Sequence, residues 1–314
     1  MELRLLRYFL AVAREQSFTR AARYLHVTQP TLSRQLMDLE EELGQRLLNR
    51  ETHTITLTPE GRLLRRRAED ILSLVDKTAS DFRAMGESIA GDIYLGGGES
   101  KAMSLLADTL AELHADYPDI RYHLYTGVAG DVLERLDKGL LDFGVLLQPI
   151  DTSGYDSLTL PVRDRWGILM PREHPLAARE AITVSDLKDT ELICPRLEPS
   201  HKAVGNPYAD WFGQELPHLR IVAIHTLLGN ASLLVERGLG LLLTIEPPHP
   251  QGRRLCFRPL SPPVFSGTCL VWKRYQVFSQ AAATLLNRLR EQFDTQRRRE
   301  DVAQTERTAS CTAP

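Results

Sequence analysis

The polar residues between Thr28 and Gln35 have the side-chain chemistry needed to read a nucleic acid. They are Thr28, Gln29, Thr31, Ser33, Arg34 and Gln35. Gln and Arg side chains can bond base edges bidentately, and Ser and Thr hydroxyls can bond a base or a phosphate. Pro30 lies among them and fits only the first turn of a helix, so the cluster belongs at a helix N-terminus, which also attracts phosphate.

Two short helices are expected to position this cluster. Four leucines, at positions 32, 36, 39 and 43, follow Thr28 at spacings that place them on one buried face of a second helix. Ser17 can cap a first helix, in which Ala21 and Ala22 are small enough to let the second helix cross closely. The pattern breaks at His26. Residues 17–43 therefore predict a helix-turn-helix, with these four leucines buried.

An ordinary packed helical hairpin with a solvated polar face is the simpler alternative. The next segment disfavours it, because Thr54–Thr58 alternates apolar and polar residues as one strand of a two-stranded wing does. Pro59 ends that strand, and a long helix pattern runs from there to residue 87. Its seam has the alternating spacing of a coiled coil and needs a partner, most simply a second copy; its residues are Leu64, Ala68, Ile71, Val75, Thr78, Phe82 and Met85.

The first 65 or so residues closely resemble the LysR-type transcriptional regulators. The resemblance is carried by Phe9, Ser17–Thr19, Ala21–Ala22, Leu25, Thr28–Ser33, Leu39–Glu40, Leu43–Gly44, Arg50 and Leu57–Gly61. It extends more loosely to about residue 294. One departure is Leu48, where the family usually has an aromatic residue before the Asn-Arg pair; this change touches packing under the wing and not the reading helix.

The resemblance implies double-stranded operator DNA as a partner, bound at an interrupted inverted repeat. It also implies self-association as a dimer or tetramer, a small-molecule effector, and RNA polymerase as a further partner. We expect the residues that contact DNA to lie in the helix-turn-helix and the wing. They are Ser17, Thr19, Arg20, Thr28, Gln29, Pro30, Thr31, Ser33, Arg34, Gln35, Arg50 and His53.

Charge and composition agree with this organisation. The 314-residue chain has a net charge of only -3, yet residues 1–67 hold twelve Lys and Arg against eight Asp and Glu. No signal peptide or membrane-spanning stretch is evident, so we expect a cytoplasmic protein with no membrane partner. The cysteines are Cys194, Cys256, Cys269 and Cys311, scattered with no Cys-x-x-Cys pair. Some LysR-type regulators sense oxidants through cysteines, but buried or incidental thiols are favoured here.

From residue 91 onward, strand and helix patterns alternate, which predicts a parallel sheet with crossovers. Strands are expected near residues 92–95, 120–126, 141–147, 166–170, 191–194, 219–224, 239–245 and 268–272; helices are expected up to 117 and over 131–138, 228–237 and 276–293. Two such lobes resemble the periplasmic binding proteins, an α/β architecture in which a ligand lies between the lobes.

The expected organisation is therefore multi-domain. A winged helix-turn-helix domain, all-α apart from its wing, covers residues 1–58, and a linker or dimerisation helix covers 59–90. An effector-binding domain covers 91–294, with lobe I at about 91–163 and 267–294 and lobe II at about 164–266. A disordered tail covers 295–314.

Ligand sites in such sheets form where strands end and the following helices begin. This rule selects Ser100, Lys101, Thr126, Gly127, Gln148, Thr226 and Asn230. Ser100 is the strongest candidate, as a donor to a carboxylate, although it could instead only cap its helix. Lys101 could add charge for an anionic effector or face solvent. His201 and His225 could line the cleft, but a structural or surface role is favoured for both.

An enzyme is disfavoured. Gly96–Ser100 lacks the spacing of a nucleophile elbow, a P-loop or a dinucleotide fingerprint, and no acidic or His-rich metal motif occurs elsewhere. We therefore expect no catalytic residue, no metal and no cofactor. The alternative is a small-molecule-binding module or a hydrolase without a regulatory role. Effector identity, target genes and the direction of regulation are left open by the sequence.

Overall fold

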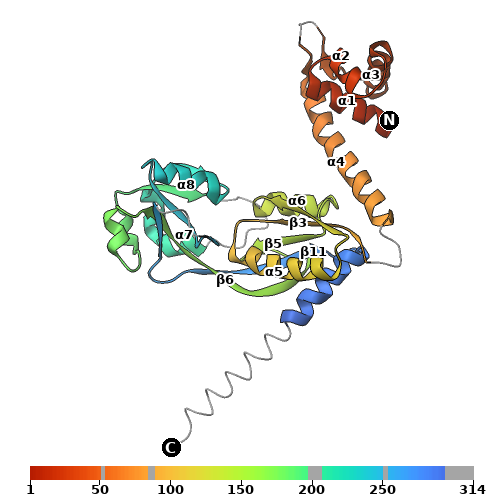
Figure 1. Cartoon of the computed structure of the whole chain (residues 1–314). Helices are drawn as coiled ribbons and strands as arrows, with labels where there is room; N and C mark the ends of the chain where they lie inside the picture. Colours follow the sequence, from red (N-terminus) through yellow and green to blue (C-terminus); the bar gives the residue numbers. More distant parts are fainter. Residues whose placement is uncertain (51–53, 84–88, 197–206, 250–253, 294–314) are drawn as a thin grey trace, which may run out of the picture. The chain divides into compact units, whose positions relative to one another are not determined.

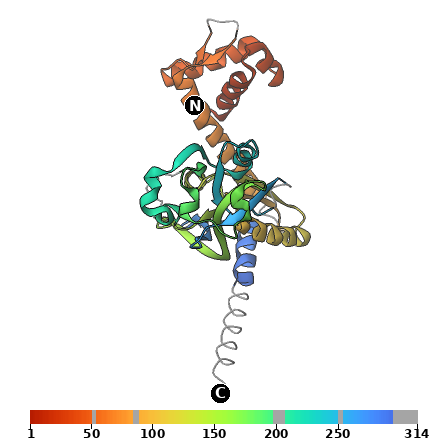
Figure 2. The same ribbon diagram turned by 90° about the vertical axis from the view of Figure 1, so that its left-hand side faces the viewer.

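The structure is a computed structural model that describes residues 1–50, 54–83, 89–196, 207–249 and 254–293. The chain forms two compact units, Met1–Phe82 and Arg83–Pro314. The first is mainly helical, and the second is built on a mixed β-sheet with helices on its faces (Figures 1 and 2).

The N-terminal unit has the predicted winged helix-turn-helix arrangement. It contains α1 (Leu3–Glu15), α2 (Phe18–Tyr24), α3 (Gln29–Leu43), β1 (Leu48–Asn49), β2 (Thr56–Leu57) and α4 (Pro59–Arg83). Ser17 is the N-cap of α2 and Thr28 is the N-cap of α3, as expected, and each side-chain oxygen accepts a backbone hydrogen bond. Gly44 ends α3 in the left-handed conformation, with φ of 65°.

The core of this unit lies where α1, α2 and α3 cross. Ala21 and Ala22 are buried there, as predicted, against Phe9 and Leu36. Leu32 and Leu39 are also buried, but the prediction for Leu43 was wrong, because this side chain is 39% exposed. Leu43 is the last residue of α3, directly before the left-handed Gly44 at which the helix ends. Leu48 packs into the same core beneath the wing.

The wing is shorter than the predicted strand. Only Thr56 and Leu57 pair, with Asn49 and Leu48 respectively in antiparallel register. The sequence analysis did not predict the partner strand β1, because two residues carry no readable alternation. Residues 51–53, which lie between the two strands, are outside the described residues.

The first half of the predicted α4 seam is used within the unit. Ala68 and Leu72 are buried against Leu6 of α1, and Leu64 and Ile71 pack beside them. The seam positions Leu64, Ala68 and Ile71 therefore pack within this unit. Exposed apolar side chains of α4 lie at Leu63 and Leu74, which are off the predicted seam, and at Phe82, which is on it. Met85 falls outside the described residues.

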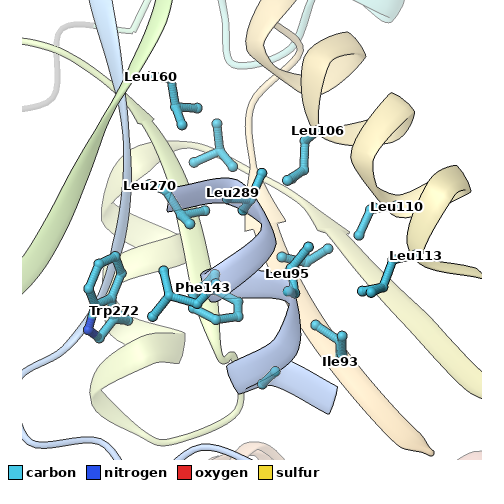
Figure 3. Close-up of a cluster of buried hydrophobic side chains, with 14 of the residues drawn as sticks. Ile93, Leu95, Leu106, Leu110, Leu113, Phe143, Leu160, Leu270, Trp272 and Leu289 are labelled. Atoms are coloured by element: carbon cyan, nitrogen blue, oxygen red, sulfur yellow. The ribbon is translucent and has the colours of Figure 1, made fainter. Parts of the chain in front are cut away.

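Lobe I of the second unit is a five-stranded section of the sheet. Its strands are β3 (Gly91–Gly97), β4 (Ile120–Thr126), β5 (Phe143–Leu147), the first part of β6 (Tyr155–Pro171) and β11 (Phe265–Lys273), in the order β4-β3-β5-β11-β6. Helices α5 (Lys101–Asp116) and α6 (Ala129–Asp137) cover it. Residues 280–293 are also helical, a shorter helix than predicted, and contribute Leu289 to the core that contains Phe143 and Trp272 (Figure 3).

Lobe II is built on the second part of β6. Its further strands are β7 (Glu191–Pro195), β8 (Arg220–His225), β9 (Leu241–Ile245) and β10 (Leu255–Pro259), and its α-helices are α7 (Pro207–Phe212) and α8 (Leu228–Glu236). Short 3₁₀ helices lie at Pro175–Ala178, Val184–Leu187 and Gly213–His218. The sequence analysis missed β10 and the first half of β6.

One strand, β6, therefore belongs to both lobes, as Figure 1 shows. Its pairing with β11 shifts register between Gly267 and Thr268. Three glycines follow the first predicted strand. Gly96 and Gly97 are strand residues, and a Cβ on Gly96 would lie 2.5 Å from Leu141 Cδ1. Their small size allows close packing and not only a turn.

Candidate functional site

The N-terminal end of α3 presents the polar cluster to solvent. Thr28 Oγ1 accepts a hydrogen bond from the Thr31 backbone N at 3.4 Å and lies 2.8 Å from Thr31 Oγ1. Pro30 lies in the first turn, where its missing N–H costs nothing. Thr28, Gln29, Pro30, Thr31 and Arg34 are exposed, while Ser33 and Gln35 are half-buried. The buried leucines hold the opposite face of the helix.

Three residues predicted to contact DNA, Ser17, Thr19 and Arg20, lie at the start of α2. The Arg20 backbone N donates to Ser17 Oγ at 3.4 Å, and the side chains of Thr19 and Arg20 are exposed. The Arg20 guanidinium pairs with Glu15 at 3.8 Å. Ser17 thus has a structural role as a cap, and Arg20 is partly engaged within its own unit.

Arg50, at the base of the wing, is held by Glu40 of α3 at 2.7 Å. The other oxygen of Glu40 accepts hydrogen bonds from the backbone N of Leu47, at 2.7 Å, and of Leu48. The side chain of Glu40 thus joins α3 to β1 and turns away from the polar cluster. His53, the remaining predicted contact, lies outside the described residues.

The side chains of Gln29 and Arg34 differ from those of Arg20 and Arg50, which form ion pairs within the unit. Within the part of the chain that the structure describes, neither Gln29 nor Arg34 makes a side-chain hydrogen bond or ion pair, and both are exposed on α3. A side chain that has no internal partner loses no internal bond when it binds a base. Both side chains are of the types that can bond base edges bidentately.

A second candidate site is a cavity of about 240 Å³ between the two lobes of the C-terminal unit. Lobe I contributes the loop before α5, the start of α6 and the end of β5. Lobe II contributes Trp166, the ends of β7 and β9, and the segment between β8 and α8. Much of the wall is apolar, with Leu146, Leu147 and Ile245 beside Trp166. An apolar wall with a few polar groups is the usual composition of a small-molecule site.

Three of the predicted effector residues, Ser100, Gly127 and Thr226, line this cavity. Ser100 is buried and is the N-cap of α5, but its side chain makes no capping hydrogen bond. The simple capping role considered for Ser100 is therefore absent. Its hydroxyl remains available for a ligand.

The other predicted effector residues lie elsewhere. Lys101 Nζ pairs with Glu246 across the lobes at 2.8 Å, while its backbone N donates to the buried Asp164 carboxylate at 3.0 Å. Thr126 lines a neighbouring groove. The Gln148 side chain lies beside Gly267, and Asn230 is exposed on α8.

Sequence reasoning missed several residues of the cavity. Arg196 follows β7 and brings a positive charge to the wall. Its place directly after a buried strand was the available signal, which the irregular sequence from Arg196 to Asn206 obscured. Glu99, Val128 and Ala129 also line the cavity. His225 lines it as considered, and burial lowers the pKa of its imidazole, so the ring is neutral at pH 7; His201 lies outside the described residues.

The N-termini of three helices meet at this cavity. Ser100 precedes α5, Val128 precedes α6 and Leu227 precedes α8, and none of these N-cap side chains makes a capping hydrogen bond. Carboxylates fill two of the ends, since Asp164 accepts from Lys101 N and Glu99 accepts from Leu228 N. Among the described residues, no side chain bonds the first N–H groups of α6. Unpaired helix N-termini attract anions.

The described residues also bear on metal binding, thiol chemistry and membrane insertion. They contain no group of three or more His, Cys, Asp or Glu that could hold a metal ion. Cys194, Cys256 and Cys269 are buried free thiols, and burial raises the pKa of Cys194 and of Cys269 to about 11. No helix in the described ranges is long and apolar enough to cross a membrane.

Family models match both units of the chain. Residues 3–62 match the bacterial regulatory helix-turn-helix protein model of the lysR family, and residues 86–294 match the LysR substrate binding domain. The Hca operon transcriptional activator HcaR of Escherichia coli is 31% identical over 281 residues, 87% of this chain and 92% of HcaR. A hydrogen peroxide-inducible genes activator of Dickeya chrysanthemi is 30% identical over 271 residues, 84% of this chain and 86% of that protein.

Solved structures share the fold along nearly the whole chain. Full-length CbnR in complex with its target DNA aligns with a TM-score of 0.73 at 20% identity, over 93% of this chain and 99% of that one. Full-length BenM aligns with a TM-score of 0.51 at 28% identity, over 94% and 98% respectively. The chain belongs to the LysR family and is a DNA-binding transcriptional regulator with an effector-binding domain, not an enzyme.

Proposed function

We propose that a small anionic molecule in the interlobe cavity controls how this regulator binds its operator. The observation that supports this proposal most directly is the meeting of Arg196, the Ser100 hydroxyl and the open N-terminus of α6 at one cavity of about 240 Å³. A carboxylate would find a positive side chain, a hydroxyl donor and free backbone N–H groups there. The apolar wall would cover a short hydrocarbon body.

The same proposal assigns operator reading to α3. Gln29 and Arg34 read base edges, while Thr28, Thr31 and Ser33 bond bases or phosphates. Ser17, Thr19, Arg20, Pro30, Gln35, Arg50 and His53 position the domain on the backbone. The exposed polar side chains at the α3 N-terminus support this assignment.

Self-association is the third element of the proposal. Leu63, Leu74 and Phe82 are exposed apolar side chains on α4, and Phe82 is 68% exposed. A dimer or tetramer that covers these side chains has paired helix-turn-helix domains. Such a pair favours an operator that is an interrupted inverted repeat. RNA polymerase is the further partner that a promoter-bound regulator implies. Analytical ultracentrifugation at working concentration should show a dimer or tetramer, and not a monomer, as the main species.

Ligand binding can change the DNA complex only if the effector binds two arrangements of the protein unequally. The cavity has walls from both lobes, so an effector that contacts both changes the free energy of one lobe arrangement relative to another. Because the DNA-binding domains belong to the same oligomer, a change in lobe arrangement can then change the affinity for the operator.

The test is a titration of operator DNA with and without small carboxylates. Ser100→Leu should abolish the effector response and leave operator affinity in the absence of effector within twofold. Ser185→Leu, at an exposed serine outside the cavity, is the matched control and should respond normally. A normal response in Ser100→Leu would remove Ser100 from the site.

A further inference from the structure

The carboxylate of Glu99 joins the two lobes of the C-terminal unit. Glu99 precedes α5 in lobe I, and its Oε2 accepts a hydrogen bond at 2.6 Å from the backbone N of Leu228 in lobe II. The two residues are 129 positions apart in the chain. Both line the interlobe cavity. A fixed negative charge therefore lies inside the cavity that we propose as the effector site.

This carboxylate occupies the positive end of α8. Leu227 is the N-cap of that helix and has no side-chain acceptor, so Glu99 supplies the bond that a polar cap would otherwise make. The next residue is Gly229, and a Cβ built there would lie 3.8 Å from Glu99 Oε1. Both oxygens of the carboxylate thus lie against the first turn of α8.

The start of α6 is different. Its N-cap is Val128, which cannot cap, and no carboxylate among the described residues takes the place that Glu99 takes at α8. An acid group of an effector has room and backbone donors at this end. A second acid group, directed across the cavity toward α8, would meet Glu99 and find the donor there already used. Like charges at close range in a partly desolvated site repel strongly.

We propose that Glu99 is a specificity-determining residue that restricts the effector to one acid group. This inference rests on the proposed function, because it assumes that the interlobe cavity binds an anion. Glu99 has two separable roles in it. Its charge rejects dianions, and its hydrogen bond to Leu228 N links the lobes.

Two substitutions separate these roles. Glu99→Gln keeps a carbonyl oxygen that can accept from Leu228 N but removes the charge. Glu99→Ala removes both. Glu112→Gln, at an exposed position on α5, removes the same charge from the same lobe outside the cavity and is the control.

The experiment measures binding of matched mono- and dicarboxylates to the full-length protein by calorimetry, with butyrate against succinate and hexanoate against adipate. The wild type and Glu112→Gln should bind the monocarboxylate of a pair at least tenfold more tightly. Glu99→Gln and Glu99→Ala should both reduce that ratio to about threefold or less. Hydrogen exchange at the Leu228 amide should be slow in the wild type and Glu99→Gln, and at least tenfold faster in Glu99→Ala.

The outcomes distinguish this inference from the proposal beneath it. If monocarboxylates bind but the ratio is unchanged in Glu99→Gln, Glu99 does not set the specificity and the anion site stands. If the wild type prefers dicarboxylates, the inference is also wrong. If neither kind of acid binds the wild type, the anionic-effector proposal fails and this inference fails with it.

Discussion

The reading surface and the effector cavity are built from contacts of very different range. The caps that start α2 and α3 join residues three positions apart. The links that close the cavity region, from Glu99 to Leu228 and from Lys101 to Glu246, join residues 129 and 145 positions apart. The first surface is a property of a short segment, whereas the second exists only once the whole domain has folded.

Leu36→Ala should have the largest effect, a loss of stability that is confined to the first unit. Leu36 is 1% exposed in the core of that unit, so its truncation should lower the unit's free energy of unfolding by about 2–5 kcal/mol. Met37→Ala, next to it on α3 but at a side chain that is 54% exposed, should cost no more than about 0.5 kcal/mol. Hydrogen exchange of residues 3–49 measures both. An equal loss of protection in residues 91–196 would show that the two units do not unfold separately.

Arg34→Ala and Gln29→Ala should each weaken operator binding by about 1–3 kcal/mol, because each removes a contact to a base edge. Folding and effector binding should be unchanged. Fluorescence anisotropy with operator and random duplexes measures the loss. Arg4→Ala, which removes a charge from an exposed ion pair on α1, is the control and should reduce specific and random binding alike. Unchanged operator affinity in both α3 variants would contradict the assignment of the reading residues.

Asp164 provides a pH-dependent test of the cavity region. Burial raises the pKa of this carboxyl, which is 0% exposed. Between the ordinary carboxyl pKa and the raised one, the folded protein holds a proton that the unfolded chain has lost, so stability falls as pH rises. Asp164→Asn should remove this decline, which is at most about 1.4 kcal/mol per pH unit.

Urea denaturation from pH 4 to 7 measures that decline. Asp156→Asn, at an exposed position on the same strand, should keep the wild-type dependence. The prediction would be contradicted if the free energy of unfolding of Asp164→Asn depended on pH in the same way as that of the wild type.

Peroxide should have the smallest effect of all, despite the similarity to peroxide-inducible activators. With a pKa of about 11, the buried Cys194 and Cys269 thiols are ionised only to about 1 part in 10⁴ at pH 7, and the thiolate is the reactive form. Cys311→Ser removes the cysteine that lies outside the described residues. Operator affinity of this variant should change less than twofold on treatment with hydrogen peroxide. A larger change that a reducing agent reverses would show that the described thiols react.

The difference in range also explains what the sequence could predict. The caps, the turn and the buried face of α3 follow from residues within one or two helical turns, so local patterns identified them. The exposure of Leu43 could not be predicted this way, because it depends on where the covering elements end. The partner of the first half of the α4 seam could not be assigned for a related reason, since the same spacing suits packing against α1 and packing against another chain.

In the effector domain, the rule that sites form at strand ends found the right edge of the sheet but not every side chain. Ser100, Gly127 and Thr226 line the cavity, whereas Lys101 points to Glu246, a partner that no local pattern indicates. Arg196 follows a buried strand, but the irregular sequence after it obscured that signal, and Glu99 was passed over although it lies beside Ser100. Glu99 is placed by β3, which pairs with β4 and β5, and Arg196 by β7, which pairs with β8 and β9.

The placement of β11 also bears on the order in which the domain is completed during synthesis. This strand comes from residues Phe265–Lys273, yet it lies between β5 and β6 in the sheet of lobe I. A ribosome therefore releases every strand of lobe II, and the whole N-terminal unit, before lobe I can acquire its missing inner strand. Until that point β5 and β6 have unpaired edges in the nascent chain, which is the period when chaperone binding would protect it most.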